Sequence, residues 1–201
     1  EHALTDLFTR VGRIQFCISA LLCSGIIIFG KGFYHFYGGP GYESSYPVAV
    51  ILVLATTIPM IQSIGVEIQR AKNLHKFRSV VYLAIALANG IISIPLCIHF
   101  GIFGCALGTA LAMFVGQGII MNVYYHRRVG LDMLYFWRNI LHFVPALLLP
   151  AALGAGILWF IDTTNLWLFL GAGIVYVAVY VGSMWLWGLN DYEKDLLMRP
   201  I

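Results

Sequence analysis

Long stretches without charge constrain this chain more than any other feature of its sequence. Five stretches contain no Asp, Glu, Lys or Arg: 14–30, 44–66, 79–126, 139–161 and 163–190. A helix needs about 20 mostly apolar residues to cross the hydrocarbon core of a bilayer. Four stretches fit one crossing each, and 79–126 fits two crossings if the chain turns at His99, Phe100 and Gly101. We therefore expect six spans, near 13–34, 46–67, 78–98, 102–124, 139–160 and 166–187.

These spans are expected to be helices, so the predicted fold class is all-α: a polytopic membrane helix bundle. Backbone polar groups find no water in hydrocarbon, so only helices and closed barrels cross a membrane. A barrel would show short segments of alternating apolar and polar residues, whereas these stretches are long and continuously apolar. The composition agrees, since 60% of the residues are hydrophobic and 10% are charged, against about 45–50% and about 25% in soluble domains.

The basic residues predict how the spans are oriented. Lys and Arg are enriched in the short cytoplasmic loops of membrane proteins. When the segments between spans are taken alternately, Lys31 stands alone on one side. The other side holds Arg10, Arg13, Arg70, Lys72, Lys76, Arg78, Arg127, Arg128, Arg138, Lys194 and Arg199. Both ends of the chain are therefore expected in the cytoplasm. The net charge of +3 is then explained by topology and by contacts with anionic lipid, and a nucleic-acid partner is not expected.

Polar residues inside the spans are unevenly distributed. In a membrane such groups are costly, and by default they face the interior of a bundle or a cavity. The first four spans hold most of them, whereas the last two hold little beyond His142 and Ser183. We therefore divide the chain into a four-helix part over 1–125, a cytoplasmic loop over 126–138, and two peripheral spans with a cytoplasmic tail over 139–201. This division suits a pathway for a hydrophilic solute.

Five polar residues in the spans are candidates for lining such a pathway: Gln15, Gln62, Glu67, Asn89 and Gln117. Glu67 is the only acidic side chain near a span interior, but Arg70 follows three residues later, so an ion pair at a helix end is an alternative role. Asn89 and Gln117 lie near mid-span, where hydrogen bonding between helices is the alternative.

Other patterns in the spans concern packing. Small residues recur at every fourth position of the fourth span, at Gly104, Gly108, Ala112 and Gly116. They share one helix face, where another helix can approach closely. Four prolines inside the spans are each expected to kink a helix: Pro59, Pro95, Pro145 and Pro150.

No catalytic or metal-binding motif occurs in the sequence. GxSxG, HExxH, GxxxxGK[ST] and paired intramembrane carboxylates are all missing. The four cysteines have no metal-ligand spacing, and we interpret them as small buried residues of the spans. They are Cys17, Cys23, Cys97 and Cys105. A transporter is therefore favoured over an enzyme. We expect no metal site and no cofactor, and leave open whether a coupling ion, H⁺ or Na⁺, takes part.

Four stretches, taken in their order and spacing, resemble one family of transporters. They are FTRVGRIQF (8–16), FGKGFYHFYGGPGYESSYPVAVILVLA (29–55), VEIQRAKNLHKFRSVVYLAIALANGIISIPL (66–96) and HFGIFGCALGTALAMFVGQ (99–117). The chain resembles the C-terminal half of bacterial polysaccharide flippases, the O-antigen and capsule repeat-unit exporters of the multidrug/oligosaccharidyl-lipid/polysaccharide exporter superfamily. The resemblance covers roughly residues 5–140 well and the last two spans in pattern only. One departure is His99-Phe100-Gly101, where Tyr-Gly is typical.

The resemblance implies that the six spans correspond to helices nine to fourteen of a fourteen-helix transporter. The first four would complete the C-terminal lobe, and the last two would pack outside it. The N-terminal lobe would then be missing, which agrees with a first residue of Glu instead of Met. We therefore expect the chain to be a piece of a longer protein.

The resemblance also implies a function: flipping of undecaprenyl-diphosphate-linked oligosaccharide across the bacterial cytoplasmic (inner) membrane by alternating access, for surface polysaccharides such as the O-antigen of lipopolysaccharide. The expected partners are this lipid-linked oligosaccharide, membrane lipids and the missing lobe. A cationic cavity residue would offset the diphosphate charge. Arg13, beside Gln15 at the entry of the first span, is the candidate; snorkelling toward the headgroups is its alternative role.

Two other functions stay open at this point. A drug or cation-coupled exporter of the same superfamily should carry deeper acidic residues than Glu67. A membrane-embedded glycosyl- or acyltransferase should show an acid and a histidine facing a cytoplasmic groove.

Overall fold

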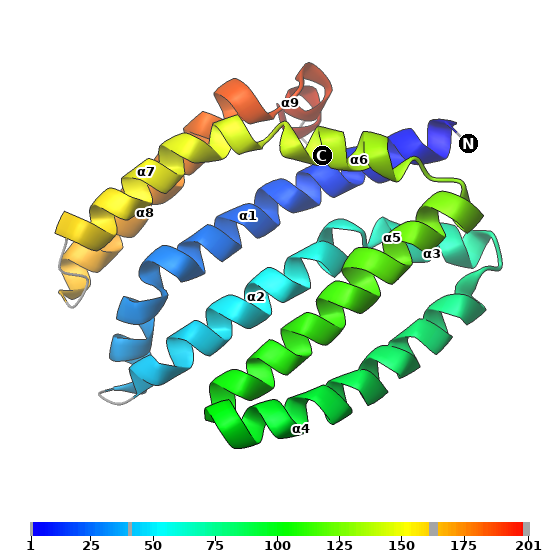
Figure 1. The fold of residues 1–201 in the computed structure, drawn as a ribbon. Helices are drawn as coiled ribbons and strands as arrows, with labels where there is room; N and C mark the ends of the chain where they lie inside the picture. The colour runs from blue at the N-terminus through cyan, green and yellow to red at the C-terminus, as the bar shows by residue number, and fades with distance from the viewer. Residues whose placement is uncertain (1, 40–41, 161–164, 199–201) are drawn as a thin grey trace. The chain divides into compact units, whose positions relative to one another are not determined.

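The computed structural model describes residues 2–39, 42–160 and 165–198, and all regular structure in these ranges is helical (Figure 1). The α-helices are α1 (His2–Gly38), α2 (Tyr46–Ile61), α3 (Ile64–Ala71), α4 (His75–Met113), α5 (Met121–Tyr124), α6 (Met133–Leu141), α7 (Val144–Phe160), α8 (Leu166–Ser183) and α9 (Asp191–Met198). A 3-10 turn, η1, covers Tyr42–Ser45, and π-helical segments cover Phe114–Ile120 (η2), Tyr125–Val129 (η3) and Met184–Gly188 (η4). The predicted all-α class is confirmed.

Four helical stretches among the described residues are long and apolar enough to cross a membrane: Ala3–Gly38, Tyr46–Ala71, Lys76–Val129 and Leu166–Gly188. A bent pair, Met133–Leu141 with Val144–Trp159, raises the number to five if it is one span. The stretch Lys76–Val129 has 54 residues, and at about 1.5 Å per residue a straight helix of that length would far exceed a bilayer of about 30 Å. The described helices therefore give four or five candidate spans, and the count of six stays a prediction.

The chain reverses at Gly101, where the sequence predicts a tight turn. Gly101 has φ 60° and ψ −143°, a conformation that is essentially restricted to glycine. Beyond this point the helix runs back beside itself, since the Thr109 hydroxyl donates to Asn89 Oδ1 at 3.2 Å. Figure 1 shows the resulting hairpin of α4 and the stretch that leads into α5. The predicted pair of spans is therefore a helical hairpin.

The small residues of the fourth span form the seam of this hairpin. Gly104, Gly108, Ala112 and Gly116 are all buried. A Cβ at Gly104 would collide with the carbonyl of Leu96, and one at Gly108 would lie 2.9 Å from the Cα of Ser93. The predicted close approach of a second helix is confirmed, and that helix is the first arm of α4.

The chain separates into two compact units. Unit 1 is built from residues 1–19 and 47–137, and unit 2 from 20–46 and 138–201. The core of unit 1 includes Phe8, Tyr125 and Phe136. The centre of the Phe8 ring lies 5.8 Å from that of Tyr125 and 4.7 Å from that of Phe136. Gly12 lets α1 pack against this core, because a Cβ there would lie 2.5 Å from the Phe136 ring.

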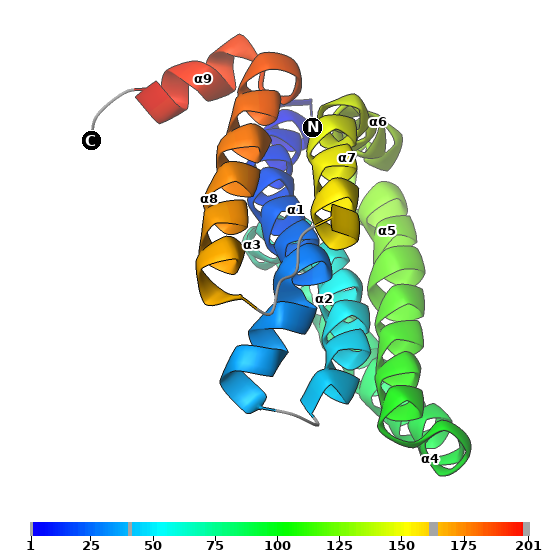
Figure 2. The ribbon, with the colours of Figure 1, turned by 90° about the vertical axis from the view of Figure 1, so that its left-hand side faces the viewer.

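Unit 2 packs the second half of α1 against α7 and α8 (Figure 2). The ring of Phe29 on α1 meets those of Phe169 and Tyr176 on α8, each at 5.6 Å between centroids. The Ser183 hydroxyl of α8 donates to the Ala146 carbonyl of α7 at 2.5 Å. Aromatic contacts join α1 to α8, and the Ser183 hydrogen bond joins α8 to α7.

The helix ends differ from the prediction in two places. Segment 126–138, expected as a loop, is helical on both sides of Gly130, Leu131 and Asp132; its cytoplasmic location stays a prediction. Pro59, Pro95 and Pro150 lie inside helices, but Pro145 falls in the first turn of α7. Proline is tolerated there because the N–H that it lacks would have no intrahelical partner.

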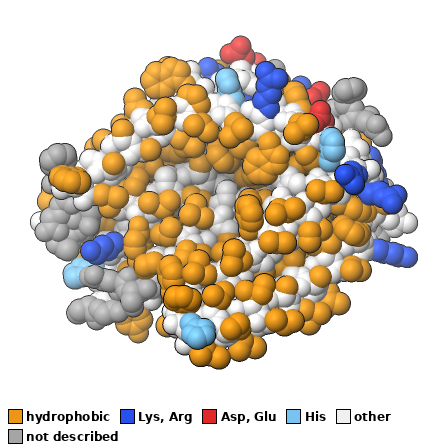
Figure 3. Space-filling model, viewed as in Figure 1, with side chains coloured by type: hydrophobic (Ala, Val, Ile, Leu, Met, Phe, Trp, Pro, Cys, Tyr) orange, Lys and Arg blue, Asp and Glu red, His pale blue; other side chains and the backbone are white. Residues whose placement is uncertain are grey.

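Large apolar side chains cover the outside of the α4 hairpin. Ile91, Ile98 and Ile102 are each at least 73% exposed, and Figure 3 shows hydrophobic side chains over this face. In water such an apolar surface would favour aggregation or binding of a partner protein. Its exposure to lipid chains carries no such free-energy penalty. The exposed surface of unit 1 therefore suits a bilayer.

Candidate functional site

Buried polar side chains on the unit 1 part of α1 are the first candidate site: Thr9 and Arg13 share one helix face, and Gln15 and Ser19 share another. Arg13 is 2% exposed, so its head does not reach outward as snorkelling would require. Gln15 donates through Nε2 to the Ser63 hydroxyl at 2.6 Å, but its Oε1 is buried without a hydrogen-bond partner. Thr9 Oγ1 and Ser19 Oγ are also buried without partners. All four side chains lie within the α1 segment of unit 1.

Asn122 joins two of the predicted pathway residues. Its Oδ1 accepts from Gln62 Nε2 at 3.1 Å and from Trp137 Nε1 at 2.8 Å. Its Nδ2 donates to the backbone carbonyls of Gln117 and Gly118. Gln62 and Gln117 are each 3% exposed. This hydrogen-bonded junction links the end of α2, η2 and α6.

The other two predicted residues lie apart from this junction. Glu67 and Arg70 form an ion pair at 3.0 Å, and their side chains are 60% and 66% exposed. Asn89 accepts hydrogen bonds from Ser93 and Thr109 within the α4 hairpin. Both residues occupy the alternative roles foreseen for them: an ion pair at a helix end and hydrogen bonding between helix arms.

A polar pocket of about 470 Å³ opens between α3 and α4 in unit 1. Its wall consists of Val66, Gln69, Arg70, Arg78, Ser79 and Tyr82. Gln69 is fully buried, and neither its Nε2 nor its Oε1 has a hydrogen-bond partner. A buried amide in such a state is rare in folded proteins.

Two tyrosines hold Arg78 in this pocket. Its guanidinium donates to the Tyr125 hydroxyl at 2.9 Å and to the Tyr82 hydroxyl, and it lies 4.8 Å from the centre of the Tyr82 ring. Gly65 makes room for Tyr125, since a Cβ there would lie 2.7 Å from the Tyr125 hydroxyl oxygen. Among the described residues, no carboxylate pairs with Arg78.

This pocket was not predicted from the sequence, because Arg78 was interpreted only as a topology signal, and Arg70 only as a topology signal or as an ion-pair partner of Glu67. A signal was present: Val66, Gln69 and Arg70 have the i, i+3, i+4 spacing of one helix face. The contribution of Tyr125 depends on a contact across 47 residues, which local spacing does not reveal.

Three basic segments meet at one end of unit 1. Lys72 Nζ donates to the Val129 carbonyl at 2.6 Å, and the Tyr124 hydroxyl donates to the Leu74 carbonyl at 3.3 Å. The backbone N–H of Asp132 donates to the Thr5 hydroxyl near the start of α1 at 3.3 Å. Lys and Arg side chains gather near these segments in Figure 3. The location of these segments on one side of a membrane stays a prediction; Arg199 of the tail lies outside the described residues.

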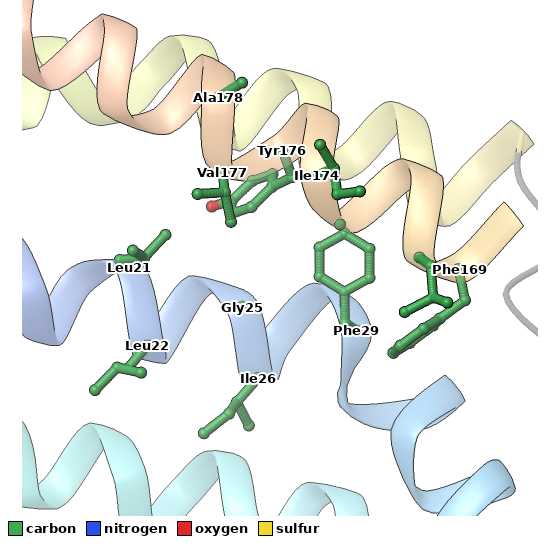
Figure 4. A pocket seen from close by; sticks show the side chains of 12 residues that line it. Leu21, Leu22, Gly25, Ile26, Phe29, Phe169, Ile174, Tyr176, Val177 and Ala178 are labelled. Carbon is green, nitrogen blue, oxygen red and sulfur yellow. The ribbon is translucent and has the colours of Figure 1, made fainter. Parts of the chain in front are cut away.

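Unit 2 contains a larger groove of about 820 Å³ between α1 and α8. Figure 4 shows Leu21 and Phe29 of α1 pointing toward α8, where Phe169 and Val177 line the groove. Its wall is almost wholly apolar, so it suits a hydrocarbon chain and offers no chemistry.

Within the described ranges, no group of three His, Cys, Asp or Glu side chains could hold a metal ion. The four cysteines are free thiols. No protein-family model matches the chain, and no curated protein and no solved structure matches it.

Proposed function

We propose that this chain is part of a membrane transporter that flips undecaprenyl-diphosphate-linked oligosaccharide repeat units across the bacterial cytoplasmic membrane. The observation that carries the proposal is the set of buried polar atoms on α1 that have no hydrogen-bond partner. Buried polar atoms are hydrogen-bonded in the great majority of cases, yet Thr9 Oγ1, Gln15 Oε1 and Ser19 Oγ have no partner. A hydroxyl-rich solute or water would supply the missing hydrogen bonds.

The charge of Arg13 on the same segment of α1 favours an anionic substrate. Arg13 is buried within the same segment, and an arginine cannot lose its charge in a protein. A diphosphate would offset that charge at the point where the lipid carrier joins the sugar. The resemblance to polysaccharide flippases points to the same substrate.

A cation-coupled exporter receives less support. Such a transporter needs a carboxylate shielded from water, and Glu67 is 60% exposed and paired with Arg70. Transport of lipid-linked oligosaccharide is therefore the function we propose, with the basic end of unit 1 facing the cytoplasm.

The full-length gene in its own host provides the test. Arg13→Ala should reduce surface polysaccharide at least tenfold and accumulate lipid-linked repeat units on the cytoplasmic face, while the protein still inserts in the membrane. Arg10→Ala is the matched control, because Arg10 lies one turn earlier on α1 and is exposed. Normal polysaccharide in the Arg13→Ala strain, with no accumulation after deletion of the gene, would overturn the proposal.

A further inference from the structure

The pocket between α3 and α4 includes none of the buried polar residues of α1, and its wall is rich in hydrogen-bond donors. Arg70, Arg78, Ser79, Tyr82 and Gln69 all contribute polar groups. Its volume of about 470 Å³ falls within the range of about 300–1,000 Å³ that is typical of small-ligand sites. We propose that this pocket binds a phosphate ester, with Arg78 as the charged anchor and Gln69 as a neutral hydrogen-bonding partner.

The charge of the wall favours an anion. Arg70 is paired with Glu67, but Arg78 keeps its full positive charge, since its described partners are two neutral tyrosine hydroxyls. A guanidinium has five N–H donors in a fixed planar arrangement. Arg78 uses one N–H on each tyrosine and retains donors for a ligand. Its planar shape matches phosphate oxygens, which it commonly binds through two parallel hydrogen bonds.

Gln69 supplies the independent evidence for a ligand. Its side chain is fully buried and forms part of the pocket wall, yet neither amide atom has a partner. An isolated buried amide destabilises a protein, and leucine would fill the same space without that cost. A phosphate oxygen can accept from the Gln69 amide N–H, and a hydroxyl of the esterified group can donate to its carbonyl oxygen.

The geometry also holds Arg78 in place before any ligand arrives. Tyr125 is 1% exposed and fixes one side of the guanidinium, and the Tyr82 ring lies against it. A positioned side chain loses little conformational freedom on binding. Two sources carry this chemistry: the headgroup of a phospholipid and a phosphate compound dissolved in the cytoplasm.

The experiment measures binding to the purified full-length protein in maltoside micelles, which contain no phosphate. One arm adds inorganic phosphate against potassium chloride of equal ionic strength, and the other adds phosphatidylglycerol. Bound ligand is counted by native mass spectrometry, and dissociation constants come from titration. Saturable binding of inorganic phosphate alone identifies a soluble phosphate compound as the ligand. Saturable binding of phosphatidylglycerol alone identifies a lipid headgroup.

Arg78→Gln and Gln69→Leu should each weaken binding about tenfold or more in the arm that binds. Lys76→Gln is the matched control, because it removes the same charge two residues from Arg78 and Lys76 is not part of the wall; its dissociation constant should change less than twofold. If the Arg78→Gln variant fails to fold, the dissociation constant of the Gln69→Leu variant still tests the proposal. Equal binding by wild type, Gln69→Leu and Lys76→Gln, or no saturable binding in either arm, would overturn the proposal.

Discussion

Replacing Asn122 with leucine tests whether one amide holds together the end of α2, η2 and α6. Asn122 takes part in four hydrogen bonds: two accepted from Gln62 and Trp137, and two donated to the carbonyls of Gln117 and Gly118. Side-chain hydrogen bonds in membrane proteins average about 0.6 kcal/mol each. Asn122→Leu should therefore lower the free energy of unfolding by about 2 kcal/mol, or about 30-fold in the folding equilibrium.

Three further variants make this measurement specific: Trp137→Phe, Gln62→Leu, and Gln62→Leu combined with Asn122→Leu. Trp137→Phe removes one donor to Asn122 and should cost about 0.6 kcal/mol. Gln62→Leu combined with Asn122→Leu should cost less than the sum of the two single changes. Asn122→Leu alone leaves the Gln62 amide, which is 3% exposed, without its acceptor, and the double variant removes that amide. Reversible unfolding in bicelles gives all four free energies. A loss below about 0.5 kcal/mol for Asn122→Leu, or strict additivity of the double variant, would refute the reasoning.

The α4 hairpin offers two more predictions. Gly101→Ala should destabilise the protein by about 1–3 kcal/mol, because φ 60° with ψ −143° strains any residue with a Cβ; an unchanged unfolding midpoint would contradict this. Gly108→Leu should separate the arms at Ser93, so cysteines placed at Ser93 and Thr109 should crosslink efficiently in the parent protein and at least tenfold less in the variant. Equal crosslinking would show that the seam tolerates a side chain.

The sequence was sufficient to predict where the long apolar helices lie. Charge-free apolar stretches locate the spans, because the cost of a charge in hydrocarbon acts on each residue separately. The turn at Gly101 and the seam at Gly104 and Gly108 could also be predicted, since spacing along one helix fixes which residues share a face. The full extent of α1, from His2 to Gly38, was missed because a helix can continue past the bilayer into polar sequence.

The candidate sites were less predictable because they depend on contacts between distant segments. Gln62 and Gln117 were expected to be polar groups of the interior, but Asn122 as their common partner is evident only once η2 and α2 are packed. Gln69 lies outside the apolar stretches, and its spacing from Val66 places both on one helix face without indicating that Gln69 is fully buried. Burial of that kind is a property of the folded unit.

The hydrogen bonds at the basic end of unit 1 have a mechanical consequence. Lys72 with Val129, Tyr124 with Leu74, and Arg78 with Tyr125 fasten the α3–α4 connection to η3 and the end of α5 at three separate points. Loss of one leaves two others, so thermal fluctuation cannot easily part these segments. A displacement of the start of α4 is therefore transmitted to Tyr124 and Tyr125, at the end of the second arm of the hairpin. We expect the two arms to move together as one rigid body.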